Sequence, residues 1–254
     1  YRSNRTAVKY DNISANMLNA LLATEDVRFY KHSGIDMKGS FAIVWYMIKG
    51  DKRGSSTITQ QLAKNLYKTR NKAFEGELTK KNRYLKKIID KTKEWITAVR
   101  LEQAFTKEEI ITMYLNTVDF GSLSFGLQTA AKTFFGKDQE HLEINEAAVL
   151  TGVLKAPTSY SPILNPKKSL YRRNTVLRQM FVYEYITQNE YDSLKILPLN
   201  LSYKVDNHTD GSAAYFRTVC SNYLNWWCQQ NGYDLWADGL KIYTTINSKM
   251  QQHA

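Results

Sequence analysis

The sequence predicts a mainly α-helical protein. Apolar residues recur at helical intervals along most of the chain, and the alternation typical of strands appears only late, near residues 199–205 and 240–246. The 254 residues contain only 4 Pro and 12 Gly, so few helix breakers interrupt these patterns. We expect one compact helical domain over residues 1–197, followed by a short mixed α/β segment over residues 198–254.

Helical periodicity predicts a series of segments along the chain. In order, they are residues 14–24, 37–49, 57–68, 80–103, 107–116, 125–134, 144–154, 167–185 and 213–229. The second segment contains an apolar octet that fits either a core helix or a stretch lying in the surface of a bilayer. The octet is shorter than the about 18 to 20 residues of a membrane span, and no other run approaches that length.

A carboxylate closes the apolar face of the first segment. Met17, Leu18, Leu21 and Leu22 form this face, and Glu25 follows Leu21 by four residues and Leu22 by three. On that phase Glu25 points inward, where partial desolvation would make its carboxylate a stronger base. The same spacing also fits a frayed helix end with Glu25 turned to water.

The run at residues 54–65 places small and hydroxyl residues at the start of a helix. Ser56 and Thr57 are good helix caps, and the unpaired N–H groups of a helix start favour an anion. Thr57, Gln61 and Lys64 share one face, which offers hydrogen bonds and a positive charge. An ordinary amphipathic surface helix would show the same pattern.

Together these two runs resemble the first two motifs of the peptidoglycan glycosyltransferases, glycosyltransferase family 51, which occur in class A penicillin-binding proteins and in monofunctional relatives. The second motif matches residues 54–65, and residues 107–116 and 172–180 resemble the fourth and fifth. The resemblance spans roughly residues 15–185. The first motif matches at Glu25, Asp26, Phe29, His32 and Gly34.

The third motif departs from the family pattern. It usually reads Arg-Lys-x-x-Glu, whereas residues 90–94 read Asp-Lys-Thr-Lys-Glu, so Asp90 stands where the family has Arg. Either Lys86, Lys87 or Lys93 supplies the missing positive charge, or this chain holds an anion less tightly than its relatives do.

Helical phase and family resemblance give different expectations for Glu94. The apolar face of the segment includes Thr92, Trp95 and Val99, and Lys91 and Glu94 lie opposite. By spacing alone, Lys91 and Glu94 form a surface ion pair of little energetic value. The resemblance instead implies that Glu94 is the second functional Glu of the family and that its side of the helix lines the cleft.

The resemblance implies a lysozyme-like α fold with a small mobile jaw, and an enzyme that polymerises lipid II into glycan strands. Glu25 would be the catalytic base of an inverting β-1,4 transfer that releases undecaprenyl pyrophosphate. Glu94 would hold the pyrophosphate site or a divalent Mg or Mn ion near it, and no cofactor is required. The implied substrate-binding residues are Asp26, Phe29, His32, Ser56, Thr57, Gln60, Gln61, Lys64, Asn65, Lys91 and Arg172.

The implied partners are lipid II, the growing lipid-linked strand, the membrane surface and a phosphoglycolipid such as moenomycin, with no nucleic acid. The implied location is the outer face of the bacterial cytoplasmic membrane, with an N-terminal transmembrane anchor missing from this chain. Residues 239–254 resemble the passage toward a transpeptidase domain, so residues 198–254 read as a linker. These residues contain no Ser-x-x-Lys motif, and we expect the transpeptidase to be absent here.

The distribution of charge agrees with a phosphate-containing partner. The net charge is +11, and residues 49–93 carry fourteen Lys and Arg against four Asp and Glu, an excess of ten. A lytic glycan hydrolase of lysozyme-like fold would also use one catalytic Glu, but it needs no such cationic site. A polyanion-binding or membrane-binding module would explain the charge, yet the sequence carries no nucleic-acid motif.

The two cysteines are predicted to be free thiols. Cys220 and Cys228 lie eight residues apart in one helical segment, which separates them by about 12 Å at the helical rise. This distance exceeds the about 7 Å between Cα atoms that a disulfide tolerates.

Overall fold

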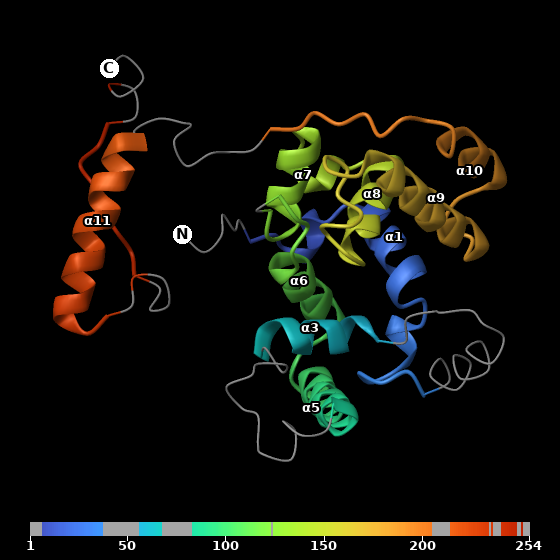
Figure 1. Cartoon of the computed structure of the whole chain (residues 1–254), viewed down its shortest axis with the longest axis horizontal. Coiled ribbons are helices and arrows are strands. Elements are labelled where there is room, and N and C mark those ends of the chain that lie inside the picture. Colours follow the sequence, from blue (N-terminus) through green and yellow to red (C-terminus); the bar gives the residue numbers. More distant parts are fainter. Residues whose placement is uncertain are drawn as a thin grey trace. The chain divides into compact units, whose positions relative to one another are not determined.

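The computed structural model describes residues 7–37, 56–67, 83–122, 124–204, 214–233, 235, 240–247 and 250. All regular elements in these residues are helices, which confirms the mainly α fold (Figure 1). The chain divides into two compact units, Tyr1–Lys204 and Val205–Ala254. The first unit therefore extends seven residues beyond the boundary expected after Leu197. Apart from Met37, the predicted helix over residues 37–49 lies outside the described part.

The core of the first unit is built from three helices, α1 (Ala15–Glu25), α8 (Ile144–Leu154) and α9 (Pro166–Val182), which pack on one another (Figure 1). Residues 145–153 of α8 are all buried, as expected for a central helix that is surrounded by others. The Ser14 hydroxyl caps α1 by accepting a hydrogen bond from the backbone N–H of Met17, at 3.1 Å. Glu25 ends α1 at the edge of this group.

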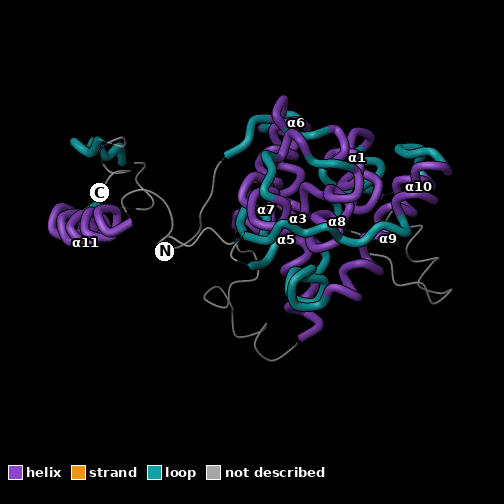
Figure 2. The backbone as a smooth tube through the Cα atoms, turned by 90° about the horizontal axis from the view of Figure 1, so that it is seen from above, coloured by secondary structure: helices purple, strands orange, loops and turns teal. Residues whose placement is uncertain are grey.

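A second group contains α3 (Ile58–Tyr67), α5 (Arg83–Ala104) and α6 (Lys107–Thr117), with α3 packed against both others (Figure 1). The helix α7 (Leu127–Phe135) packs against both α6 and α8 and so connects the two groups (Figure 2). The described part of the first unit also contains the 3-10 turns η1 (Tyr10–Asn12), η2 (Phe29–Lys31) and η4 (Gln139–His141).

The buried face of α5 differs from the one that apolar spacing predicted. Trp95 is 40% exposed, whereas Glu94, Ala98 and Leu101 are buried. The prediction from helical phase alone was therefore wrong for Glu94, which is 2% exposed. The physical reason is that α5 meets α3 through a polar network centred on Lys91, whose hydrogen bonds compensate for the desolvation of a carboxylate.

The end of the first unit contains a helix that periodicity did not predict. This helix, α10 (Gln188–Leu194), starts with a capping box in which Thr187 and Glu190 satisfy each other's backbone N–H groups. Residues 199–204 then run without helix, and Ser202 and Lys204 donate backbone hydrogen bonds to the last turn of α7. Because their partner is a helix end, the expected strand does not form there.

The second unit contains one described helix, α11 (Ala214–Asn231). Cys220 and Cys228 both lie on it as free cysteines, which confirms the prediction from their spacing. Residues 240–247 form no strand with any described residue, contrary to the expected alternation. Among the described residues of the whole chain, no helix combines the length and apolar character that crossing a membrane requires.

Candidate active site

Glu25 is held between two other helices. Gln61 of α3 donates its amide Nε2 to Glu25 Oε2 at 2.8 Å. Arg172 of α9 places Nη2 3.8 Å from Oε1, the other carboxylate oxygen. The side chain of Glu25 is 17% exposed, which leaves part of the carboxylate open to a ligand. Of the two orientations that the sequence left open, the structure has the inward one.

The arginine beside Glu25 lies across the central helix. A Cβ added at Gly152 of α8 would meet Arg172 Cγ at 3.2 Å, so the small residue leaves room for the arginine. The guanidinium centre also lies 5.9 Å from the centroid of the Tyr160 ring. Its Nε atom is buried and has no hydrogen-bond partner among the described residues. Arg172 thus brings a positive charge to the carboxylate, with donor capacity to spare.

The remaining residues of the first motif support α3. Asp26 Oδ2 accepts the backbone N–H of Ile58 at 3.0 Å, which caps the start of α3. His32 Nε2 lies 3.0 Å from both oxygens of Asp26. Phe29 is fully buried and meets the His32 ring edge to face, with 6.1 Å between centroids. In this geometry Asp26 joins His32 to the start of α3, and Phe29 packs against the His32 ring.

The second and third motifs meet at Lys91. Its Nζ atom donates to Ser56 Oγ at 2.8 Å, to Gln60 Oε1 at 2.9 Å and to Glu94 Oε2 at 3.2 Å. The side chain of Lys91 is 28% exposed, whereas that of Glu94 is 2% exposed. This arrangement presents one lysine charge, backed by a buried carboxylate, next to the helix that carries Gln61.

The expected divalent ion finds no prepared site in the described part of the chain. No cluster of three His, Cys, Asp or Glu side chains that could hold a metal occurs among these residues. The Glu94 carboxylate already has the Lys91 ammonium beside it. The possible divalent ion near Glu94 therefore stays a prediction.

The other second-motif residues separate into a buried and an exposed group. Thr57 is 3% exposed, and its hydroxyl donates to the carbonyl of Gly34 at 2.7 Å. Gln60 Nε2 donates to the same carbonyl at 3.1 Å. Lys64 and Asn65 lie on the exposed side of α3 and form no hydrogen bond or ion pair with another described residue. The structure does not gather these two around Glu25.

Several polar residues of the site were missed by the sequence analysis. Tyr114 of α6 is 1% exposed and donates its hydroxyl to Gln61 Oε1 at 2.9 Å. Glu102 accepts hydrogen bonds from Thr59 at 2.5 Å and from Lys107 at 2.8 Å. The signal for Tyr114 was a hydroxyl on the apolar face of its helix, since a buried phenol usually finds a partner.

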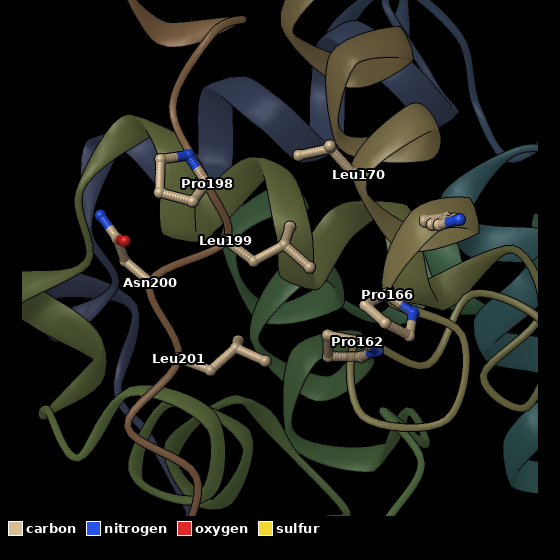
Figure 3. A pocket seen from close by; sticks show the side chains of 8 residues that line it. Pro162, Pro166, Leu170, Pro198, Leu199, Asn200 and Leu201 are labelled. Atoms are coloured by element: carbon tan, nitrogen blue, oxygen red, sulfur yellow. The ribbon is translucent and has the colours of Figure 1, made fainter.

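An apolar pocket lies apart from these residues (Figure 3). Its volume is about 410 Å³, and apolar side chains dominate its walls. None of the predicted site residues lines it, so the pocket is not part of the site. Its apolar lining consists of Pro162, Pro166, Leu170, Pro198, Leu199 and Leu201.

A partly exposed carboxylate beside an arginine, on a helical scaffold, is an arrangement that enzymes acting on glycosidic bonds can use. A family model described as transglycosylase matches residues 1–181. The chain therefore belongs to the transglycosylase family, and it is an enzyme of the peptidoglycan glycosyltransferase type.

Comparison with individual proteins agrees with this family. The chain is 36% identical to penicillin-binding protein 1A of Escherichia coli over 98% of its own length and 28% of that protein. It is 37% identical to penicillin-binding protein 1A of Aquifex aeolicus, covering 98% of this chain and 32% of the relative. It is 35% identical to penicillin-binding protein 1F of Bacillus subtilis, covering 100% of this chain and 34% of that protein. The chain thus spans about a third or less of these relatives.

Among solved structures, the chain is similar to a crystal structure of penicillin-binding protein 1A from Haemophilus influenzae. The sequence identity is 24% and the TM-score is 0.49. The similarity covers 98% of this chain and 25% of that one.

Proposed function

We propose that this chain polymerises lipid II, a disaccharide-peptide carried on undecaprenyl pyrophosphate, into glycan strands. The observation that carries this proposal is the position of Glu25, which keeps partial exposure between an amide donor and an arginine. A base for the acceptor and a cation for a departing phosphate are the two groups that such a transfer needs.

In the proposed reaction Glu25 takes the proton of the acceptor's GlcNAc 4-hydroxyl. The hydroxyl oxygen forms a bond to the anomeric carbon of the donor's MurNAc. The bond from that carbon to the pyrophosphate oxygen breaks, and the electron pair leaves with undecaprenyl pyrophosphate. Attack opposite the leaving group converts an α-linked donor into a β-1,4 product, by analogy with inverting glycosidases.

The departing pyrophosphate needs positive charge, for which Lys64, Lys91 and Arg172 are the proposed sources. Lys91 is the best prepared of these, because three acceptors fix its ammonium while it stays partly exposed. Arg172 is already next to the base. The exposed Lys64 would join them only when substrate is bound.

The proposed role of Glu94 is to hold Lys91. A buried carboxylate 3.2 Å from the ammonium holds it in place, where it also donates to Ser56 and Gln60. Glu94 is therefore proposed as a second essential carboxylate that acts through a neighbouring cation, without direct contact with the sugar.

The proposed partners and location follow from the lipid character of the substrate. We propose that the domain works against the membrane surface, on the outer face of the bacterial cytoplasmic membrane. We also propose that a phosphoglycolipid such as moenomycin binds here, because it combines a lipid, a phosphate and sugars as the growing strand does. A net charge of +11 supports partners that carry phosphate.

Incubation with fluorescent lipid II tests the proposed function. Long glycan chains are the expected product. Cleavage of pre-made strands without polymerisation would support the lytic hydrolase instead. Binding of the lipid without turnover would support the membrane-binding or polyanion-binding module.

A further inference from the structure

We propose that Tyr114 is a positioning residue for the reaction and that it acts on Glu25 through Gln61. The proposal rests on the proposed function, in which Glu25 is the base. It adds a residue to which the sequence analysis gave no role, and it distinguishes the two oxygens of the Glu25 carboxylate.

The chain of contacts crosses three helices. The Tyr114 hydroxyl of α6 donates to Gln61 Oε1 at 2.9 Å, and Gln61 Nε2 of α3 donates to Glu25 Oε2 of α1 at 2.8 Å. Helix α3 packs directly on α6, so the first link is part of a helix interface (Figure 1). Each donor in this series meets an acceptor, and the series ends on the proposed base.

Tyr114 and the acceptor-only Glu25 carboxylate together fix which way the Gln61 amide faces. Burial, and secondly the nearby Glu25 carboxylate, raise the pKa of the Tyr114 phenol well above its ordinary value, so its hydroxyl stays a donor. If the amide turned over, Nε2 would face the phenol oxygen, and the phenol hydrogen would lose its acceptor. Tyr114 is 1% exposed and has no other acceptor among the described residues, so this reversal is costly.

The fixed amide makes the two oxygens of Glu25 different. Oε2 is occupied by the Gln61 N–H, whereas Oε1 has no hydrogen-bond donor among the described residues. The charged group that faces Oε1 is Arg172 of α9, at 3.8 Å. No charged side chain of α8 lies within ion-pair distance of Glu25 in the described part of the chain. The geometry therefore assigns Oε1 as the oxygen that receives the acceptor's proton.

Removing the Tyr114 hydroxyl should change the base without changing substrate binding. In Tyr114→Phe the amide can turn once Glu25 is protonated, and its Oε1 then accepts a hydrogen bond from the Glu25 carboxyl. This contact favours the protonated carboxyl, so the acid limb of the pH–rate profile should move to higher pH. The kcat for lipid II should fall by about tenfold, because Oε1 is held less precisely, while KM stays unchanged.

The control is Thr112→Val on the same helix. The Thr112 hydroxyl is buried and has no hydrogen-bond partner among the described residues, so its removal breaks no hydrogen bond with them. The kcat of Thr112→Val and the acid limb of its pH–rate profile should match those of the parent chain.

Gln61→Met provides an independent test, because it keeps the side-chain length and leaves Tyr114 intact. It should lower kcat as Tyr114→Phe does, and Tyr114→Phe added to it should have no further effect on kcat or on the acid limb. Additive effects, or an unchanged acid limb in folded Tyr114→Phe, would overturn the proposal. Should Tyr114→Phe fail to fold, a folded Gln61→Met with unchanged kcat would overturn it equally.

Measuring Glu25→Gln alongside these variants shows whether a failure lies in the role of Tyr114 or in the assignment of Glu25 as the base. If Glu25→Gln polymerises lipid II normally, the assignment of the base is wrong. If Glu25→Gln is inactive while Tyr114→Phe behaves like the parent chain, only the role of Tyr114 is wrong.

Discussion

Arg172 and Arg173 are neighbours in the sequence with opposite surroundings. Arg172 lies beside Glu25. Arg173 is fully buried and donates to Asn145 Oδ1 and to the backbone carbonyls of Lys195, Leu197 and Pro198. Desolvation lowers the pKa of the Arg173 guanidinium, and carbonyl and amide acceptors replace the lost water. One arginine serves the site, and the other fastens the end of the first unit to α9.

This contrast predicts different results for matched substitutions. Arg173→Met removes donors from several buried carbonyls, so unfolding should become easier by about 2 kcal/mol or more. Arg172→Met should change the free energy of unfolding by less than about 1 kcal/mol, as expected for a loose ion pair, but should lower polymerisation. Thermal unfolding and lipid II turnover of both variants check this. Equal loss of stability in the two variants would contradict the assigned roles.

Asp90 stands in the third motif where the family has Arg, so replacing it tests the effect of that missing charge. Asp90→Arg adds favourable charge one helical turn before Glu94, and the gain of about 1 kcal/mol should tighten phosphoglycolipid binding several-fold. The gain should shrink as salt rises. Lys91→Ala should weaken binding of the same ligand. The dissociation constants at low and high salt test both, and weaker binding by Asp90→Arg at both salts would show that Asp90 has a specific role.

At the scale of elements, the loop after α1 sets the distance between the first motif and α5. Gly34 has φ 86°, and a Cβ there would lie 2.9 Å from the backbone carbonyl of Ala98. The carbonyl of Gly34 also accepts hydrogen bonds from Thr57 and Gln60. A single glycine therefore allows α3, α5 and the first-motif loop to meet.

Gly34→Ala should separate these elements, because backbone atoms of a helix cannot move aside as a flexible side chain can. We expect a loss of about 2 kcal/mol or more in stability, together with a loss of activity. Gly136→Ala is the matched control: it has φ 66°, but its nearest neighbour is the Ser202 hydroxyl at 3.5 Å. It should lose only about 1 kcal/mol, from strain. Similar unfolding midpoints for the two variants would refute the close approach.

Periodicity located most described helices because their apolar faces are buried in the way that spacing indicates. It located α5 but gave the wrong buried face, because Glu94 is buried there beside Lys91 and hydrogen bonds across an interface leave no trace in a hydrophobic pattern. It also failed on α10, whose seven residues are too short for a clear period, although the Thr187 and Glu190 capping box was readable.

The candidate site was predictable only where motif residues could be matched one by one. Glu25 and Arg172 were predicted in this way, and the structure places them close together although they are far apart in the sequence. The contact between Gln61 and Tyr114 could not be predicted, because it depends on how α3 and α6 pack. Local spacing carries no information on that packing.

For the whole molecule, the described fold and the absence of a Ser-x-x-Lys motif predict one activity rather than two. These 254 residues should not be acylated by labelled penicillin, whereas a phosphoglycolipid should bind with an affinity that falls as salt rises. Gel fluorescence and a binding titration check the two statements. Covalent labelling would mean that the chain contains a nucleophile that the sequence does not reveal.

The most direct test of the central claim is the turnover of fluorescent lipid II by Glu25→Gln. The amide has nearly the same shape as the carboxyl, so thermal unfolding should stay near that of the parent chain. Polymerisation should fall by at least about 100-fold, the usual contribution of a general base. Turnover close to that of the parent chain, from a folded variant, would contradict the assignment of Glu25 as the base.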